Sequence, residues 1–259
     1  SSAASDVYKR QLLYNLKLQD WDPELCQFFG VPMETLPRII NCDEYIGECR
    51  IKGKTLRLGG LIGDQQASLL GQNCVRTGDF KTTFGTGAFM LANVGNTPVL
   101  HKQLITTVAW RTREGITYAL EGNMYSAGSC INWLQDQFKL IDSPQESETL
   151  AGSVEDTGGV LFVPALSGLG APFWKGNARA QFAGITLAST SAHIVRAVLR
   201  GITYNTRAVF DCMQETFPVS EKQMRVDGGM TNNSLLMQFQ SDIMHFLSLI
   251  HISEPTRPY

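Results

Sequence analysis

Alternating strand and helix patterns run through most of this chain, and they constrain its fold more than any other feature of the sequence. Short runs of β-branched and aromatic residues alternate with longer runs that repeat apolar residues every three or four positions. Strands are predicted at 55–62, 80–83, 89–94, 116–121, 160–164 and 223–227, and helices at 23–29, 65–72, 127–140, 193–217 and 233–245. This order predicts an α/β fold.

The two ends of the chain do not read as native protein sequence. Residues 1–11 (SSAASDVYKRQ) back-translate without a mismatch into a sequencing-library adapter, and LSLIHISEPTR, which begins residues 247–259, back-translates into the reverse complement of the partner adapter. A disordered Ser/Ala-rich arm resembling a transit peptide is the alternative, but two unrelated tails would then have to match paired adapters by chance. We expect residues 12–246 to carry the native fold.

Charge, hydropathy and cysteine spacing argue against several classes of function. The formal net charge is −2 over 259 residues, so we expect neither nucleic acid nor an anionic membrane as a partner. The most apolar stretch, residues 159–174, is interrupted by Pro164, Gly168, Gly170 and Pro172, which predicts no transmembrane segment. The six cysteines show no spacing typical of a metal site or a redox motif, and a reducing cytoplasm suits them best.

Asp64 lies where a predicted strand meets a predicted helix. A carboxylate at this position can accept the proton of an attacking hydroxyl group, as a general base does. It can also cap the helix, which the local sequence alone favours and which would make it a weaker base. Gln65 and Gln66 favour the first interpretation, because two consecutive amides at the mouth of a loop suit hydrogen bonds to a polyol. The alternative for them is a solvated first helical turn.

Two glycine turns are candidates for binding phosphate. Gly85-Thr86-Gly87 joins two predicted strands, and a missing Cβ lets backbone N–H groups approach phosphate oxygens closely. Gly228 and Gly229 follow a predicted strand and precede a predicted helix, a natural place for a nucleotide. Each pattern alone is weak, since many hairpins use glycine without a ligand. Together with Asp64, the turns predict phosphoryl transfer to a small-molecule hydroxyl group without a GxxxxGK[ST] loop.

Taken in order, several segments of the chain resemble the FGGY carbohydrate kinase family. They are GLIGDQQASLLGQ, KTTFGTGAFML, YALEGNMYSAGSCINWL, VPALSGLGAPFW and RVDGGMTNNSLLMQFQSDIM. The resemblance covers residues 12–246, and GDQQA and MQFQSDI are similar to the branch that phosphorylates glycerol. It implies a partial actin-like ATPase fold with RNase H-like domains. Residues 12–73 would be the C-terminal part of the first domain, and 74–246 most of the second.

The same resemblance implies roles for individual residues. Asp64 corresponds to the catalytic base and to a carboxylate near the metal ion, while Gln65 and Phe89 correspond to residues that hold glycerol. The positions that correspond to nucleotide contacts are Gly85, Thr86, Gly87, Gly128, Asn132, Gly228, Gly229 and Asn233. We therefore expect ATP and Mg²⁺ as cofactors, glycerol as the acceptor and glycerol 3-phosphate as the product.

Some features depart from the family pattern. Asn132 stands where bacterial members commonly carry Gln, and Arg200 stands where the family has an acidic residue or Gln. The loop at 51–57 lacks the Gly-rich pattern linked to sugar-bisphosphate inhibition, so we expect no such regulation. The first phosphate loop and the remaining glycerol-binding residues would precede Leu12. We expect the chain to be a fragment that does not turn over by itself.

Two other functions fit the same motifs. One is a related kinase for another polyol or a ketose, which a substrate panel would reveal through preference for a pentulose. The other is a non-catalytic nucleotide-binding relative, which would bind ATP without releasing ADP in response to glycerol. The sequence is compatible with a homo-oligomer and does not specify the oligomeric state.

Overall fold

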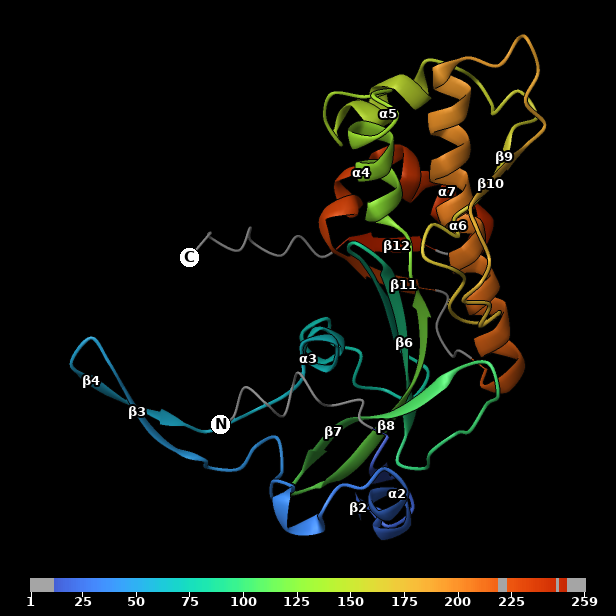
Figure 1. Cartoon of the computed structure of the whole chain (residues 1–259). Coiled ribbons are helices and arrows are strands. Elements are labelled where there is room, and N and C mark those ends of the chain that lie inside the picture. The colour runs from blue at the N-terminus through green and yellow to red at the C-terminus, as the bar shows by residue number, and fades with distance from the viewer. Residues whose placement is uncertain (1–11, 219–222, 246, 251–259) are drawn as a thin grey trace.

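Six strands form one central sheet in the computed structural model, which describes residues 12–218, 223–245 and 247–250 (Figure 1). In sheet order they are β12 (Leu247–Ile250), β11 (Gln223–Asp227), β5 (Phe80–Phe84), β6 (Ala88–Gly95), β8 (Gly115–Met124) and β7 (Ile105–Thr112). The β12, β11 and β5 strands are parallel, whereas β5, β6, β8 and β7 are antiparallel to their neighbours. The carboxyl ends of β5, β8 and β11 therefore lie at one edge, together with the start of β6.

Helices cover the two faces of the sheet unequally (Figure 1). The long helix α6 packs on one face and contacts three neighbouring helices, whereas α3 packs on the other face against β6 and β7. These helices are α3 (Asp64–Gly71), α4 (Gly128–Asp136), α5 (Glu146–Gly152), α6 (Ser191–Thr216) and α7 (Ser234–Met244).

Alternation along the strands supplies an apolar layer to each face. On β6, Met90 and Ala92 belong to the large core beside α6, whereas Leu91 packs with Leu69 of α3. Successive side chains of a strand point to opposite faces, so one strand serves both cores. The ring of Phe80 on β5 contacts Phe210 of α6, with 5.5 Å between ring centroids. The face beside α3 is less apolar, and the candidate site lies there.

Smaller elements surround the sheet. The segment before α3 holds two antiparallel pairs and a short helix, and the β3–β4 hairpin projects away from the body of the molecule (Figure 1). These elements are β1 (Tyr14–Asn15), β2 (Asp20–Trp21), α2 (Pro23–Phe28), the 3₁₀ turn η1 (Met33–Thr35), β3 (Gly47–Ile51) and β4 (Lys54–Leu58). Later in the chain lie β9 (Leu161–Val163), β10 (Gln181–Ala183) and the 3₁₀ turn η2 (Gly229–Asn232).

Most predicted elements are confirmed, and the others differ in their bounds or in their pairing. The hairpin of β5 and β6, the helix at 193–217 and the strand at 223–227 are present. The strand predicted at 55–62 ends at Leu58, so an irregular segment, 59–63, separates it from Asp64. The strand predicted at 160–164 is β9, which pairs with β10 outside the main sheet and is half exposed. Helix α5 and strands β1, β2, β3, β7, β10 and β12 were not predicted, and the helix predicted at 127–140 ends at Asp136.

Strand β12 lies within residues that the sequence predicts to be adapter-derived. It pairs in parallel with β11, with Leu247 opposite Gln223. Backbone hydrogen bonds between strands form whatever the origin of the sequence, so this pairing does not test the adapter hypothesis. The adapter origin of 247–259 stays a prediction. The predictions for residues 1–11 and 251–259 lie outside the described residues. Within the part of the chain that the structure describes, no helix combines the length and apolar content needed to cross a bilayer.

Candidate active site

Asp64 is the first residue of α3 and is exposed. Gly63 occupies the capping position without a side-chain bond, and the carboxylate oxygen Oδ1 of Asp64 accepts the backbone N–H of Gln65 at 2.7 Å. Asp64 is therefore not the capping residue, although it does bond an amide of the first turn. An exposed carboxylate held at a helix start can still reach a ligand.

The two glutamines after Asp64 do not form a solvated turn. Gln66 is 7% exposed, and its Oε1 is buried without a hydrogen-bond partner among the described residues. Gln65 is half buried, and its Oε1 accepts a hydrogen bond from Nζ of Lys81 on β5 at 2.7 Å. The first turn of α3 is thus fixed against the sheet through a lysine.

A polar cluster fills the space between α3 and the ends of the central strands. Lys81 is fully buried and also donates to Oγ1 of Thr83. Ser68 of α3 donates to Oδ2 of Asp227, the last residue of β11, at 2.6 Å. The other oxygen of Asp227, Oδ1, is buried without a partner among the described residues. This cluster joins α3 to the strands that carry both glycine turns.

Burial decides the protonation behaviour of Lys81. Loss of hydration lowers its pKa from 10.5 to about 8, and the negative charge of Asp227 is the largest opposing influence. Cys74, Glu121 and Asp64 oppose the shift further. The lysine is therefore charged at neutral pH and can serve its neighbours only as a hydrogen-bond donor.

Phe89 lies on the same face of the sheet as this cluster. It pairs with Thr83 across β5 and β6, is half buried, and packs against the small apolar core beneath α3. The structure therefore brings Phe89, Gln65 and Asp64 to one face.

The hairpin turn and the start of α4 are bonded together. The carbonyl of Gly85 accepts the N–H of Gly128 at 2.9 Å, and the carbonyl of Thr86 accepts the N–H groups of Ala127 and Ser129 at 3.0 Å. These N–H groups are used within the fold and are not a free anion site. A nucleotide contact by Gly128 would therefore not use its backbone N–H.

The predicted nucleotide-binding glycines fall into two groups. A Cβ on Gly87, Gly128 or Gly228 would lie 2.5, 2.6 or 2.3 Å from a backbone oxygen of a neighbouring segment. These three glycines are therefore required by close packing of backbone on backbone. A Cβ on Gly85 would meet only an ordinary contact at 3.7 Å, and one on Gly229 would meet nothing within 4 Å. Packing leaves these two open to a ligand.

The two predicted asparagine contacts differ in their surroundings. Asn132 is exposed on α4, one turn after Gly128. Asn233 caps α7 by accepting the N–H of Leu236 at 2.9 Å, and its amide donates to Oγ of Ser147 at 3.2 Å. The fold therefore explains Asn233 without a ligand, whereas Asn132 has no comparable explanation.

The donor set at the start of α3 fits a divalent cation that shares phosphate ligands. Mg²⁺ is commonly bound by one or two carboxylates together with water and phosphate oxygens. Asp64 supplies one exposed carboxylate, but no group of three acidic, His or Cys side chains that could hold a metal occurs among the residues described. The site therefore fits Mg²⁺ bound with a nucleotide rather than a cage made of side chains alone.

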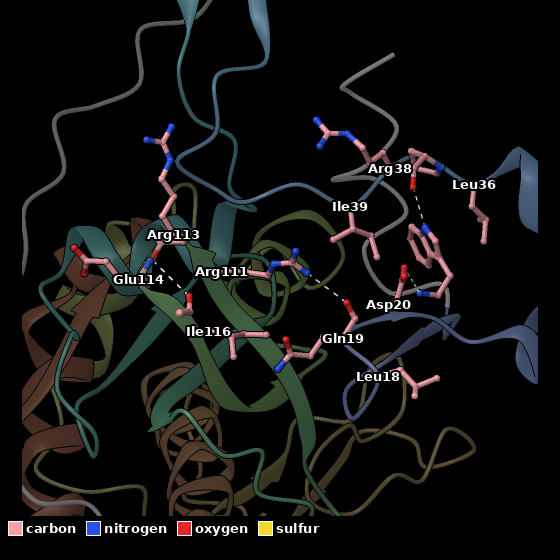
Figure 2. Close-up of a pocket in the computed structure, with 14 residues that line it drawn as sticks. Leu18, Gln19, Asp20, Leu36, Arg38, Ile39, Arg111, Arg113, Glu114 and Ile116 are labelled. Atoms are coloured by element: carbon pink, nitrogen blue, oxygen red, sulfur yellow. Dashed lines mark hydrogen bonds between the residues drawn. The ribbon is translucent and has the colours of Figure 1, made fainter.

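A large cavity lies elsewhere in the molecule. Its volume is about 790 Å³, and it is lined by residues 18–21, 36–39 and 111–116 (Figure 2). Arg111 crosses it and donates to the carbonyl of Gln19 at 3.4 Å and to Oδ1 of Asn41 at 2.9 Å. The cavity is at the start of β8, whereas the candidate site is near its end, and none of the predicted site residues lines it.

Sequence reasoning missed Lys81 and Ser68 as members of the site, and it noted Asp227 only as part of the second glycine turn, without its bond to Ser68. A lone lysine in a strand normally faces solvent, and no local pattern shows that a distant helix will cover it. No comparable pattern in the neighbouring residues marks Lys81 or Ser68.

Comparison with known proteins places this geometry in a family. Residues 80–252 match the C-terminal domain of the FGGY family of carbohydrate kinases, and residues 4–71 match its N-terminal domain. A glycerol kinase of Parabacteroides distasonis is 46% identical over 237 residues, covering 90% of this chain and 48% of the relative. Glycerol kinase 2 of Sulfolobus acidocaldarius is 43% identical, covering 91% of this chain and 47% of the relative.

Solved structures agree. A crystal structure of Plasmodium falciparum glycerol kinase with ADP matches with a TM-score of 0.85 and 36% identity, over 94% of this chain and 50% of that one. Xylulose kinase from Lactobacillus acidophilus matches with a TM-score of 0.78 over 94% of this chain and 50% of that one; at 23% identity, it shows the fold alone. The fold is thus the actin-like ATPase fold predicted from the sequence. The chain spans about half the length of the relatives it matches, and it belongs to the FGGY family of carbohydrate kinases.

Proposed function

We propose that this chain forms part of an enzyme that transfers the γ-phosphoryl group of ATP to glycerol, giving glycerol 3-phosphate. Glycerol kinases among its relatives support the substrate, and the chain spans about half of their length. We propose further that the chain by itself does not turn over, because the first phosphate loop expected of the family has no match within it.

One observation carries the proposal. Lys81 bonds both Gln65 at the start of α3 and Thr83 near the end of β5, two residues before the glycine hairpin. The residue proposed to bind the polyol is therefore linked through one buried side chain to Thr83, two residues before the turn proposed to bind phosphate. Holding acceptor and donor in register is the main task of a phosphoryl-transfer site.

Each predicted site residue of this chain would then have a separate role in phosphoryl transfer. Asp64 accepts the proton of the attacking hydroxyl group, while Gln65 and the ring of Phe89 orient the polyol. The turn at Gly85 and Thr86 steadies the transferring phosphate. Asn132 and Gly229 would contact the nucleotide on exposed surface, with Gly87, Gly128, Gly228 and Asn233 shaping the turns beside it.

Asp64 would also hold Mg²⁺ together with phosphate oxygens. When bound, this ion neutralises the negative charge on the phosphates.

We further infer a cytoplasmic location, since all six cysteines are unpaired, as is usual in a reducing compartment.

The catalytic role of Asp64 can be tested in a hybrid kinase. The hybrid consists of the Parabacteroides distasonis relative with its matching segment replaced by residues 12–246 of this chain. We expect Asp64→Asn to lower kcat by at least ~100-fold, the usual range for a general base. Asp136→Asn, an exposed residue at the end of α4, is the matched control and should retain turnover. Near-normal turnover of the Asp64 variant would return that residue to a structural role at the first helical turn.

Substrate and nucleotide can be tested separately. In the hybrid, glycerol should be preferred over pentuloses, and a preference for a pentulose would overturn the choice of glycerol. The 259-residue chain itself should be stabilised by ADP, by about 2.7 kcal/mol at ~100 times the Kd. Binding of ATP by an active-site-intact hybrid without glycerol-dependent ADP release would instead identify a nucleotide-binding protein.

A further inference from the structure

The interior of the candidate site holds a lysine that links Gln65 to Thr83 but has no chemical role assigned to it in the proposed reaction. Lys81 is fully buried, and buried lysines are rare unless their ammonium is paired. Its Nζ donates to Oε1 of Gln65 at 2.7 Å and to Oγ1 of Thr83. No family role assigned above from the sequence involves this side chain, yet it contacts the residue proposed to bind glycerol.

The groups around Lys81 favour its charged form. The carboxylates of Asp227 on β11, Glu121 on β8 and Asp64 on α3 oppose the effect of burial on its pKa. A protonated lysine offers three donors and no acceptor. The oxygen of the Gln65 amide must therefore face Lys81, and the NH₂ end of that amide points elsewhere.

We propose that Lys81 is a positioning residue, which fixes the Gln65 amide so that its NH₂ group, rather than its oxygen, is presented to the acceptor polyol. This proposal rests on the proposed function, because it deepens the role of Gln65 at the same site. An NH₂ donor bonds a lone pair of a hydroxyl oxygen and leaves that hydroxyl's own proton for another partner. The carboxylate of Asp64, the preceding residue, is the acceptor available for that proton.

A second bond holds the same helix in register. Ser68 lies about one turn after Gln65 and donates to Asp227 at 2.6 Å, beside the Asp-Gly-Gly turn. Two charged groups of the sheet, Lys81 and Asp227, thus hold successive turns of α3. Bonds to charged groups are stronger than neutral ones, which suits the positioning of a substrate-binding amide.

The contact itself is tested in the 259-residue chain. Gln65→Ala removes an acceptor from a buried ammonium and should lower Tm by about 3 to 10 °C. In a Lys81→Met background, the same change should lower Tm by less than about 2 °C, because the ammonium is gone. Equal losses in the two backgrounds would show that the residues are not coupled and would overturn the proposal.

The amide orientation is tested in the hybrid kinase. Gln65→Glu keeps an acceptor for Lys81 but cannot donate to a hydroxyl oxygen, so KM for glycerol should rise roughly 10-fold or more, while KM for ATP changes little. Lys81→Met should raise KM for glycerol in the same selective way. Gln137→Glu, exposed after α4, is the control for added charge.

The outcomes separate this proposal from the proposed function. If the unmodified hybrid does not phosphorylate glycerol, the proposed function fails. If it does, and Gln65→Glu leaves KM for glycerol unchanged or lower, then the oxygen faces the polyol and the positioning role of Lys81 is wrong. A rise in KM for ATP equal to that for glycerol would indicate a merely structural effect and would also overturn it.

Discussion

The two adjacent glycines of the Asp-Gly-Gly turn should differ strongly in how much stability an alanine substitution costs. Gly228 has φ +96°, and a Cβ there would lie 2.3 Å from the carbonyl oxygen and 2.6 Å from the carbonyl carbon of Phe84. Gly229 lacks a positive φ, and a Cβ there would meet nothing within 4 Å. The backbone of β5 cannot move away cheaply, because Phe84 is paired with Ala88 in the sheet.

The magnitude follows from two costs. A side chain at a positive φ in this region costs roughly 1 to 3 kcal/mol, and forcing an atom into a packed contact costs a similar amount. We therefore expect Gly228→Ala to lower the free energy of unfolding by about 4 kcal/mol. Gly229→Ala should change it by less than ~0.5 kcal/mol, as for exposed positions without special geometry.

The assay is thermal unfolding of the 259-residue chain and its two variants, followed by circular dichroism with and without ADP. A loss of about 4 kcal/mol corresponds to a Tm lowered by roughly 8 to 16 °C for a domain of this size. Gly229→Ala should keep the Tm and lose part of the stabilisation by ADP, because that glycine is open to a ligand. Equal Tm values for the two variants would refute the packing argument, and an unchanged ADP effect in Gly229→Ala would remove that residue from the nucleotide site.

Three further predictions follow from contacts elsewhere in the structure. Asn233→Ala removes the cap of α7 and should cost about 1 kcal/mol in urea unfolding, whereas Asn232→Ala, at an exposed neighbour, should cost little. Gly122→Ala places a Cβ 2.2 Å from Cγ1 of Val209 and should cost ~1 to 3 kcal/mol; a double variant with Val209→Ala should lose less than the sum of the single losses. Burial lowers the pKa of Lys81 from 10.5 to about 8, so between these pH values the unfolded chain binds more protons and stability rises with pH. Relative to Lys81→Met, that rise should approach ~3 kcal/mol, and its absence would contradict the pKa shift.

Local sequence patterns predicted the elements whose pattern is self-contained. The hairpin of β5 and β6 has β-rich runs on both sides of a glycine turn, and α6 has a long apolar stripe, so both were predicted. Strand β7 (Ile105–Thr112) was missed, because it lies at the edge of the sheet and most of its residues are only partly buried, which weakens any alternation. The strand at 160–164 was predicted without its place in the fold, since apolar content does not reveal that β9 pairs outside the main sheet.

The candidate site was predicted in part for the same physical reason. Residues in turns can be recognised in the sequence, because glycine is needed where backbones approach closely. Lys81 gave no such signal: its burial depends on α3, and α3 reaches it only through the tertiary fold. Local sequence patterns cannot predict the burial of a polar group by an element that is distant in the chain.

A glycine in this site can be required by close backbone packing or by contact with a ligand, and a sequence motif does not distinguish the two. The turns at the ends of β5, β8 and β11 pack closely together because Gly87, Gly128 and Gly228 let backbone lie on backbone. That packing creates the place where a nucleotide could bind, so replacing any of the three would abolish binding whether or not the residue touches a ligand. Among the five predicted nucleotide-binding glycines, Gly85 and Gly229 are the two that close packing does not require. Loss of nucleotide binding with an unchanged Tm at these two positions is therefore the result that can assign a glycine to the ligand itself.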